Sequence, residues 1–316
     1  MKQLSFIDDF INTLHLKFKK RSLLVNFIAE NLKIEKESAS RRLSKKVAFT
    51  IDEVAILSLK LDISLDSLLK KDEEINFSPI KVSSSDELLD MVKVNISFID
   101  TMSDKATDMG CIFNAIPIEF CVPFPYLCKF FYYKWECYAM PKKITANYST
   151  WKLPDKVTEL NAEIIRILNK YRKIFYIWDL SAIARHVQEL AYFEKLNLID
   201  SDDIYLIKND LHKMLHMFEA VADNQEKLVN GDISFYISDN YIDLNAYYYH
   251  NKEHLLCTSQ IHFIKSAVGK NKIICKNIYN WINSMKDVSI LISGDNEKER
   301  KLFFNEQHKI IGYPEK

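Results

Sequence analysis

The stretch KIEKESASRRLSKKVAFTIDE, Lys33–Glu53, decides the fold of the N-terminal part of this chain. Its first half is polar, and four basic residues fall within positions 41–46. The segment before it has its apolar residues at helical spacing, at Leu24, Phe27, Ile28 and Leu32. We therefore predict a polar helix over about 35–45 that is braced by two amphipathic helices and docks through Ala39 and Leu43.

The segment after the polar helix begins with a helix-start signal. Thr50 can serve as the N-cap, and Glu53 stands three residues later, which is the spacing of a capping box. We expect the helix that starts here to pack its apolar residues inward, namely Ile51, Val54, Ala55, Leu57, Leu59 and Leu61. The next segment, DISLDSLL at 62–69, predicts a final short helix.

The charge of the whole chain says nothing about its partners, but the distribution of that charge does. Lys plus Arg and Asp plus Glu are equal, at 43 each among 316 residues. Between His15 and Thr50, however, ten basic residues stand against three acidic ones, a local excess of seven positive charges. A concentrated basic patch is the electrostatic footprint of a protein that binds a polyanion.

The predicted polar helix carries side chains that can read DNA. Arg can pair bidentately with guanine, and Glu can accept a hydrogen bond from the cytosine amino group. We expect four residues on its outer side to contact base edges: Lys36, Glu37, Ser40 and Arg41. We expect four flanking residues to contact phosphates: Arg42, Ser44, Lys45 and Lys46. The partner predicted in this way is double-stranded DNA.

These residues lie in a segment that resembles the phage-repressor and Cro-like helix-turn-helix domains, a family often called XRE-like. LLVNFIAENLKI is similar to the scaffold helix of that family, EKESASRRLSKK to its recognition helix and FTIDEVAILSLKL to its fourth helix. DISLDSLL is similar to its ending, which is the most specific piece. The family often has Gly just after the recognition helix, where this chain has Lys45, and Ala29 can supply its small packing residue. The resemblance covers Arg21–Leu69 and implies a DNA-binding transcription regulator.

A polar segment, LKKDEEINFSPIKVSSSDE at Leu69–Glu87, interrupts the helical pattern. Its charge, its Ser residues and its Pro are typical of a linker. We therefore expect a helix-turn-helix domain at 1–76, a linker at 77–87 and a second domain at 88–316. Because helix-turn-helix proteins gain affinity by binding two half-sites, we expect the second domain to form a homodimer, to sense a small-molecule effector of unknown identity, or both.

The second domain is predicted to be mostly helical with a small antiparallel sheet, which makes the whole chain α+β. Helices are expected over 179–196, from Ser201 onward, over 272–285 and at the C-terminal end. Residues 233–264 are rich in β-branched and aromatic side chains and predict a meander of three short strands. The run VSILIS, Val288–Ser293, predicts a short buried strand.

Three clusters of side chains admit a chemical and a structural interpretation. His212, His216 and Glu219 share one predicted helix face at a spacing that a metal ion could use, but no HExxH motif accompanies them. Four cysteines follow no zinc pattern and are interpreted as buried thiols: Cys111, Cys121, Cys128 and Cys137. The aromatic run at 130–135 could line a pocket or a dimer interface, and we prefer a core role.

No fingerprint of an enzyme is visible in the chain. We find no P-loop, Rossmann motif or nucleophile elbow, and five Gly in the chain make phosphate-cradling loops improbable. We therefore expect no catalytic residue, no metal and no cofactor. Two alternatives stay open. The C-terminal domain could be a DNA-targeted nuclease or hydrolase that uses His212, His216 or His262, or the N-terminal helices could be a protein-interaction module.

The chain carries no pattern for secretion or membrane insertion. Its start, MKQLSFIDDF, has acids where a signal peptide needs an apolar core. Its most apolar stretch, Cys111–Trp135, contains Glu119, Lys129 and three prolines, which a membrane span would have to carry through the bilayer. The six cysteines form no CxxC pair and suit reduced thiols. We expect a cytoplasmic protein.

Overall fold

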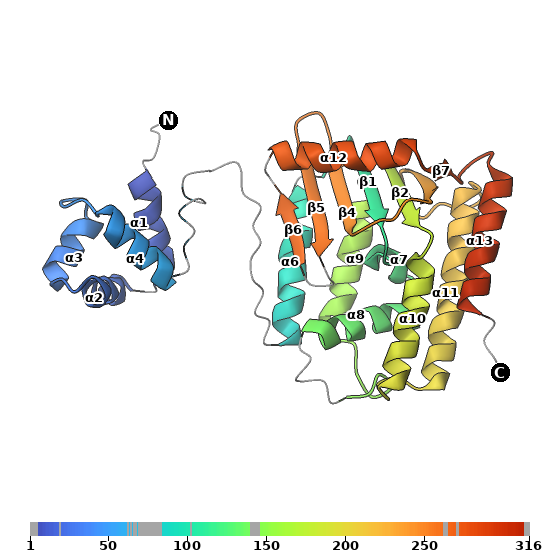
Figure 1. Ribbon diagram of the computed structural model, residues 1–316, viewed down its shortest axis with the longest axis horizontal. Coiled ribbons are helices and arrows are strands. Elements are labelled where there is room, and N and C mark those ends of the chain that lie inside the picture. Colours follow the sequence, from blue (N-terminus) through green and yellow to red (C-terminus); the bar gives the residue numbers. More distant parts are fainter. Residues whose placement is uncertain are drawn as a thin grey trace. The chain divides into compact units, whose positions relative to one another are not determined.

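The computed structural model divides the chain into two compact units, Met1–Glu74 and Ile75–Lys316, each with an apolar core of its own (Figure 1). The structure describes residues 6–18, 20–61, 63, 65, 68, 84–101, 103–139, 146–261, 265–269 and 272–312. Most of the segment expected to be a linker therefore lies outside the described residues.

The N-terminal unit is a small bundle of short helices. Its helices are α1 (Phe6–Leu16), α2 (Arg21–Leu32), α3 (Lys36–Leu43) and α4 (Ile51–Leu61). Their inner faces form one apolar core, which includes Phe10, Leu14, Leu24, Ile28 and Leu57. The structure confirms that α3 is polar and that its buried residues are Ala39 and Leu43. The last helix expected from the sequence, over 62–69, falls mostly on residues outside the described set.

A tight turn connects α2 to α3. Lys33 adopts a left-handed backbone with φ of 54°. The amide of Ile34 then donates to the carbonyl of Ala29 at 3.0 Å, so the chain reverses within three residues. This is the Schellman type of helix ending, in which a left-handed residue lets the backbone satisfy the last carbonyls of the helix.

The start of α4 was predicted correctly, but its buried face was not. The Glu53 amide donates to Thr50 Oγ1 at 3.2 Å and the Thr50 amide donates to Glu53 Oε2 at 3.0 Å, which confirms the capping box. Ile51 and Leu59, expected to pack inward, are 86% and 84% exposed. The helix is apolar on nearly all sides, and a small bundle can cover only the stripe that contains Val54 and Leu57.

The C-terminal unit is built on a mixed sheet. Within the described residues this sheet has seven strands, in the order β6-β5-β4-β1-β2-β3-β7. The strands are β1 (Asp108–Phe113), β2 (Lys173–Asp179), β3 (Asp232–Ser238), β4 (Asn245–His250), β5 (Leu255–Ile261), β6 (Lys265–Gly269) and β7 (Ile290–Leu291). β1, β2 and β3 run parallel, while β4, β5, β6 and β7 pair antiparallel with their neighbours.

The expectation of a small antiparallel sheet was therefore wrong. The chain is α+β, but the centre of the sheet is parallel, and β1 and β2 were not predicted at all. Strands do form within the range expected for the meander, 233–264, but only β4 and β5 pair with each other there, because β3 pairs with β2 instead. The third strand of the antiparallel part is β6, which lies beyond the predicted range. The sequence KIFYIWD of β2 is a continuous apolar run, as in strands that are buried on both faces, and it lacks the alternation that marks an exposed sheet. A strand forms within Val288–Ser293 as expected, but it is the two-residue edge strand β7, and Ile290 is 43% exposed, so the strand is not buried.

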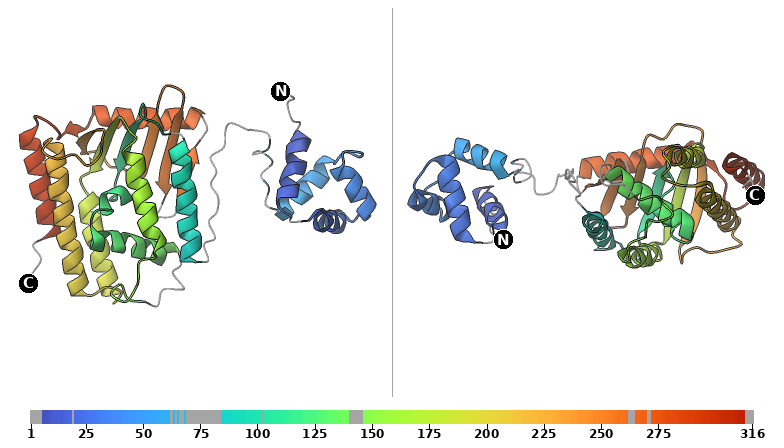
Figure 2. Two further views of the ribbon diagram at one scale, coloured as in Figure 1. Left: turned by 180° about the vertical axis from the view of Figure 1, so that it is seen from behind. Right: turned by 90° about the horizontal axis from the view of Figure 1, so that it is seen from below.

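Helices cover both faces of the sheet, so the unit has three layers (Figure 2). Side chains such as Ile112, Ile177 and Tyr248 form a core with α12 (Lys272–Asp287) on one face. Alternate side chains such as Phe113, Tyr176 and Trp178 form the larger core on the other face. The helices on this second side are α6 (Ser85–Thr101), α7 (Ile118–Cys121), α8 (Pro125–Ala139), α9 (Lys156–Leu168), α10 (Ala182–Lys195), α11 (Ser201–Ala222) and α13 (Glu297–Ile311).

Further expectations for this unit can be compared with the structure. The six cysteines are buried free thiols, and the aromatic run at 130–135 is core, as preferred. Residues 85–87, expected in the linker, form the first turn of α6, because Ser84 Oγ accepts a hydrogen bond from the Glu87 amide at 3.2 Å and caps the helix. Within the described ranges, no helix combines the length and the apolar character that crossing a membrane requires.

Candidate nucleic-acid interface

The outer side of α3 presents the residues expected to read DNA bases. Lys36, Glu37 and Arg41 are exposed, and Ser40 is half-buried. A helix turns by about 100° per residue, so Arg41 lies almost opposite the midpoint of Ala39 and Leu43. Because those two residues dock the helix, the Arg41 guanidinium extends away from the core of the unit.

Arg42 has a different environment from the one expected of a phosphate ligand. Its Nε donates to Glu53 Oε2 at 2.9 Å and its Nη2 donates to Glu53 Oε1 at 2.8 Å. The two side chains are only 15% and 16% exposed. Arg42 therefore joins α3 to the capping box of α4, and its contact to a phosphate stays a prediction. The hydrogen bonds from Arg42 also lower the pKa of Glu53, which keeps this carboxylate charged.

The residues after α3 form a second Schellman ending. The Lys45 amide donates to the Arg42 carbonyl at 3.0 Å and the Lys46 amide donates to the Arg41 carbonyl at 2.9 Å. Lys45 itself has a φ of 60°, in the left-handed region that Gly occupies most easily. Lys45 therefore adopts a backbone conformation for which Gly is the usual choice.

The other expected phosphate ligands differ in what they contact. Lys45 Nζ forms an ion pair with Asp8 of α1. Ser44 is exposed, and its hydroxyl donates to the Arg41 carbonyl at 3.1 Å. Lys46 is exposed and, like Lys36 and Arg41, forms no ion pair with any residue that the structure describes. These three cations are the side chains around α3 that are most available to a polyanion.

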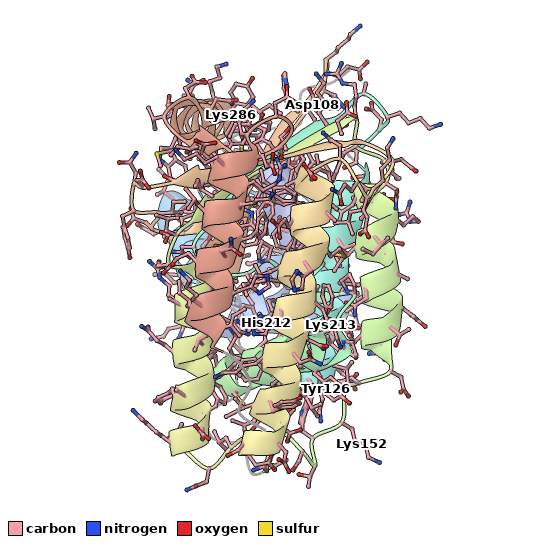
Figure 3. The ribbon with its side chains drawn as sticks, turned by 90° about the vertical axis from the view of Figure 1, so that its right-hand side faces the viewer. Asp108, Tyr126, Lys152, His212, Lys213 and Lys286 are labelled. Atoms are coloured by element: carbon pink, nitrogen blue, oxygen red, sulfur yellow. The ribbon has the colours of Figure 1, made fainter. Side chains whose placement is uncertain are left out.

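The histidines of the C-terminal unit are arranged differently from the metal site that their spacing suggested. His212 lies on α11 (Figure 3). Its ring stacks on that of His308 of α13, and the two Nδ1 atoms are 2.7 Å apart. Two nitrogen ligands of one zinc ion, each at about 2.1 Å, would lie roughly 3.4 Å apart in tetrahedral geometry. The two Nδ1 atoms are closer than this, so they are not placed to share a zinc ion. Among the described residues, no group of three His, Cys, Asp or Glu side chains is arranged to hold a metal ion. His262, named for the enzyme alternative, lies outside the described residues.

The environment of His308 also changes its protonation. Burial, followed by the neighbouring His216 and His212, lowers the pKa of His308 to about 4. His308 is therefore neutral at pH 7, and it packs against α11 as an aromatic ring. No sequence pattern indicates the pair of His212 and His308, because the two residues lie on different helices that only the tertiary fold brings together.

Comparison with known proteins identified no relative of this chain. No family model matches the chain, and no curated protein and no solved structure matches it. Function must therefore be inferred from the residues of α3 and from their surroundings.

Proposed function

We propose that this protein is a transcription regulator that binds double-stranded DNA and inserts α3 into the major groove. The observation that supports this most directly is the docking of α3. A short helix that is held by Ala39 and Leu43 presents Arg41 on the opposite side, with Glu37 exposed beside it. Arg and Glu are side chains that discriminate between base pairs in the major groove.

The electrostatics of the N-terminal unit support the same proposal. The basic excess between His15 and Thr50 is only partly neutralised by Arg42–Glu53 and Lys45–Asp8. Lys36, Arg41 and Lys46 are exposed around α3, so a phosphate backbone that runs past the helix meets cations on more than one side. Contacts of this kind hold the protein in register, while contacts to base edges supply the specificity.

A homodimer is part of the proposal. α3 has eight residues and is about 12 Å long, so one copy reads only a few base pairs. Two copies that bind half-sites about one helical turn apart gain the affinity and the specificity that one copy lacks. The C-terminal unit, with its large core, is the part that we expect to supply self-association, ligand sensing, or both.

One observation favours a second candidate function for the N-terminal unit. Ile51 and Leu59 lie eight residues apart on the same side of α4 and are almost fully exposed. Apolar side chains in such an arrangement suit contact with another protein. The N-terminal unit would then act as a protein-interaction module, which was one of the alternatives that the sequence left open.

The test is a selection of DNA from a random duplex library with the purified full-length chain. We expect an enriched motif whose two halves repeat about 10 base pairs apart. Lys60→Ala is the control variant, because it removes a positive charge from the exposed side of α4 and leaves α3 unchanged. It should enrich the same motif as the wild type. If the wild-type chain enriches no motif, it does not bind DNA in a sequence-specific way. Binding of all duplexes alike would reduce the proposal to an electrostatic association.

A further inference from the structure

A cavity lies in the C-terminal unit at the carboxyl ends of β1 and β2. Its volume is about 330 Å³, and its lining includes Asn114 after β1 and residues of the first turns of α10 after β2. Loops that follow parallel strands at their carboxyl ends are common places for ligand sites. The cavity lies against the loop after β1 and the start of the helix after β2.

The loops that frame the cavity are held by buried polar side chains. Asn245 Oδ1 accepts hydrogen bonds from the amides of Asn114 and Ala115, at 3.0 and 3.2 Å. Asp179 Oδ1 accepts from the Ser181 amide at 2.7 Å, and Oδ2 accepts from the Ile242 amide at 3.1 Å. Both residues are largely buried, so the walls are formed before any ligand arrives.

Arg185 brings a positive charge into this cavity. Its guanidinium lies over the ring of Tyr241, 5.3 Å from the centroid. The nearest acid is Asp179, whose Oδ2 is 3.7 Å from Nη2, beyond hydrogen-bond distance. The guanidinium donates no hydrogen bond to any residue that the structure describes. It is thus oriented by a ring and a carboxylate, while its N–H groups keep their capacity to bind an anion bidentately.

The start of α10 adds to this positive potential. Ala182, the first residue of this 14-residue helix, lines the cavity. The first N–H groups of a helix have no partner within the helix, and together with the helix dipole they favour an anion.

His186 gives the wall of the cavity a neutral aromatic ring. Its side chain lines the cavity, is 4% exposed and packs edge-to-face against Phe130 of α8, and its Nε2 is enclosed by protein. Burial, followed by the charge of Lys134, lowers the pKa of His186 well below its usual value, so the ring is neutral.

The acid beside His186 does not repel an anion strongly. Glu189, which also lines the cavity, pairs with the buried Lys134 at 2.5 Å. The Glu189 charge is therefore balanced within the wall. Ile116 and Tyr192 supply apolar surface to the remainder of the cavity.

We propose that this cavity binds a small organic anion. Arg185 and the start of α10 hold its carboxylate or phosphate group, and Ile116 and Tyr192 contact its apolar body. Such a ligand is the effector of the regulator. That role rests on the proposed DNA-binding function, whereas the binding itself does not.

The test measures binding to the full-length chain by calorimetry, in the absence of DNA. The probes are 3-phenyllactate, phenyl phosphate and the neutral phenylacetamide, so that the first two distinguish a carboxylate from a phosphate ligand. We expect at least one anionic probe to bind about tenfold or more tightly than phenylacetamide. Arg185→Gln should weaken that probe by about tenfold or more, because it removes the charge and the bidentate fork.

Arg166→Gln is the matched control, since Arg166 of α9 lies in surface ion pairs with Asp100 of α6 and Glu163 of α9 and should leave binding unchanged. If Arg185→Gln does not fold, nitrogen NMR of the wild-type histidines decides, and the ring signals of His186, which lines the cavity, must shift when the probe saturates the site. The proposal is overturned if neither anion binds at about 10 mM, or if the neutral probe binds as tightly as the anions. It is also overturned if a folded Arg185→Gln binds the anion as tightly as the wild type, or if the His186 signals do not change. A chain that binds the anion but no DNA would contradict the proposed function alone.

Discussion

Arg41 is the residue on which the proposed reading of bases depends most. Replacing Arg41 by Ala should cost about 1–3 kcal/mol of binding free energy at the selected DNA site and little on scrambled DNA, because a bidentate contact to a base is lost. Fluorescence anisotropy titrations with both duplexes measure this difference. The stability of the chain should stay nearly unchanged, since the side chain is exposed.

Lys46→Ala is the companion variant for that titration. Lys46 follows the end of α3 and can reach a phosphate, so its loss should weaken binding to both duplexes alike and reduce the salt slope by about one unit. An equal loss on both duplexes for Arg41→Ala would show that α3 does not read sequence in this orientation. No effect of either variant would mean that the basic surface is merely solvated.

Glu119 gives the C-terminal unit a pH dependence. This carboxyl group is 7% exposed, and burial raises its pKa to about 7 from an ordinary 4.5. Between these two values the folded state holds more protons than the unfolded state, so stability falls as the pH rises from 4.5 to 7. Glu119→Gln should remove this loss and stabilise the chain above pH 7, by up to about 3 kcal/mol at about 1.4 kcal/mol per pKa unit.

Thermal melts of wild type and Glu119→Gln between pH 4.5 and pH 8 test this expectation. His308 acts in the opposite direction, because its pKa of about 4 lies below its ordinary 6.5 and its neutral form is lost by protonation as the pH falls. Both chains share that effect, so the difference between them isolates Glu119. Glu306→Gln, at an exposed position of α13, should melt in parallel with the wild type. A parallel curve for Glu119→Gln would disprove the assigned role of burial.

At the scale of secondary-structure elements, the contact between α3 and α4 decides how firmly the candidate recognition helix is held. Arg42→Ala leaves Glu53 without its bidentate partner and loosens the start of α4. Removal of one member of a half-buried pair should destabilise the N-terminal unit by about 1–3 kcal/mol. Hydrogen exchange at the amides of α3 and α4 should accelerate accordingly, while the amides of the C-terminal sheet should keep their rates.

This variant also separates structure from DNA contact. Because Arg42 joins two helices and is mostly covered, its loss should weaken DNA binding only through the looser position of α3. A second substitution, Glu53→Gln, keeps the shape of the partner and removes its charge, so it should reproduce the same loosening in smaller measure. If Arg42→Ala leaves hydrogen exchange unchanged but lowers the salt slope, Arg42 binds a phosphate after all, as the sequence had suggested.

At the scale of the whole molecule, the proposed function requires two copies of α3. We expect the full-length chain to sediment as a dimer, and a fragment of 84–316 to do so as well, because the proposed function assigns self-association to the C-terminal unit. That unit has a core of its own and should fold without the N-terminal helices. A fragment of 1–74 should sediment as a monomer. A strictly monomeric full-length chain at about 100 µM, with and without DNA, would argue against recognition of paired half-sites.

Local patterns were sufficient for the N-terminal unit. The polar helix with Ala39 and Leu43 inside and the capping box at Thr50 both depend on residues fewer than ten positions apart, and helix propensity and capping act over that distance. The burial of α4 was less predictable. When a helix has apolar residues on several sides, its sequence does not indicate which side packs against the other helices. Ile51 of α4 is exposed for this reason.

The sequence by itself therefore determined the helices α2 to α4 and α10 to α13, the polar face of α3 and the strands β3, β4 and β5, whereas it did not indicate the central strands β1 and β2. Only the tertiary structure decided which strands became neighbours, that Arg42 meets Glu53 instead of solvent, and that His212 meets His308. It also brought Asn114, Arg185 and His186 to one cavity, although Asn114 lies far from the other two in the sequence. The physical reason is that hydrogen-bonded turns and amphipathic spacing are local, whereas strand pairing and side-chain clusters form when segments that are distant in the chain bury apolar surface together.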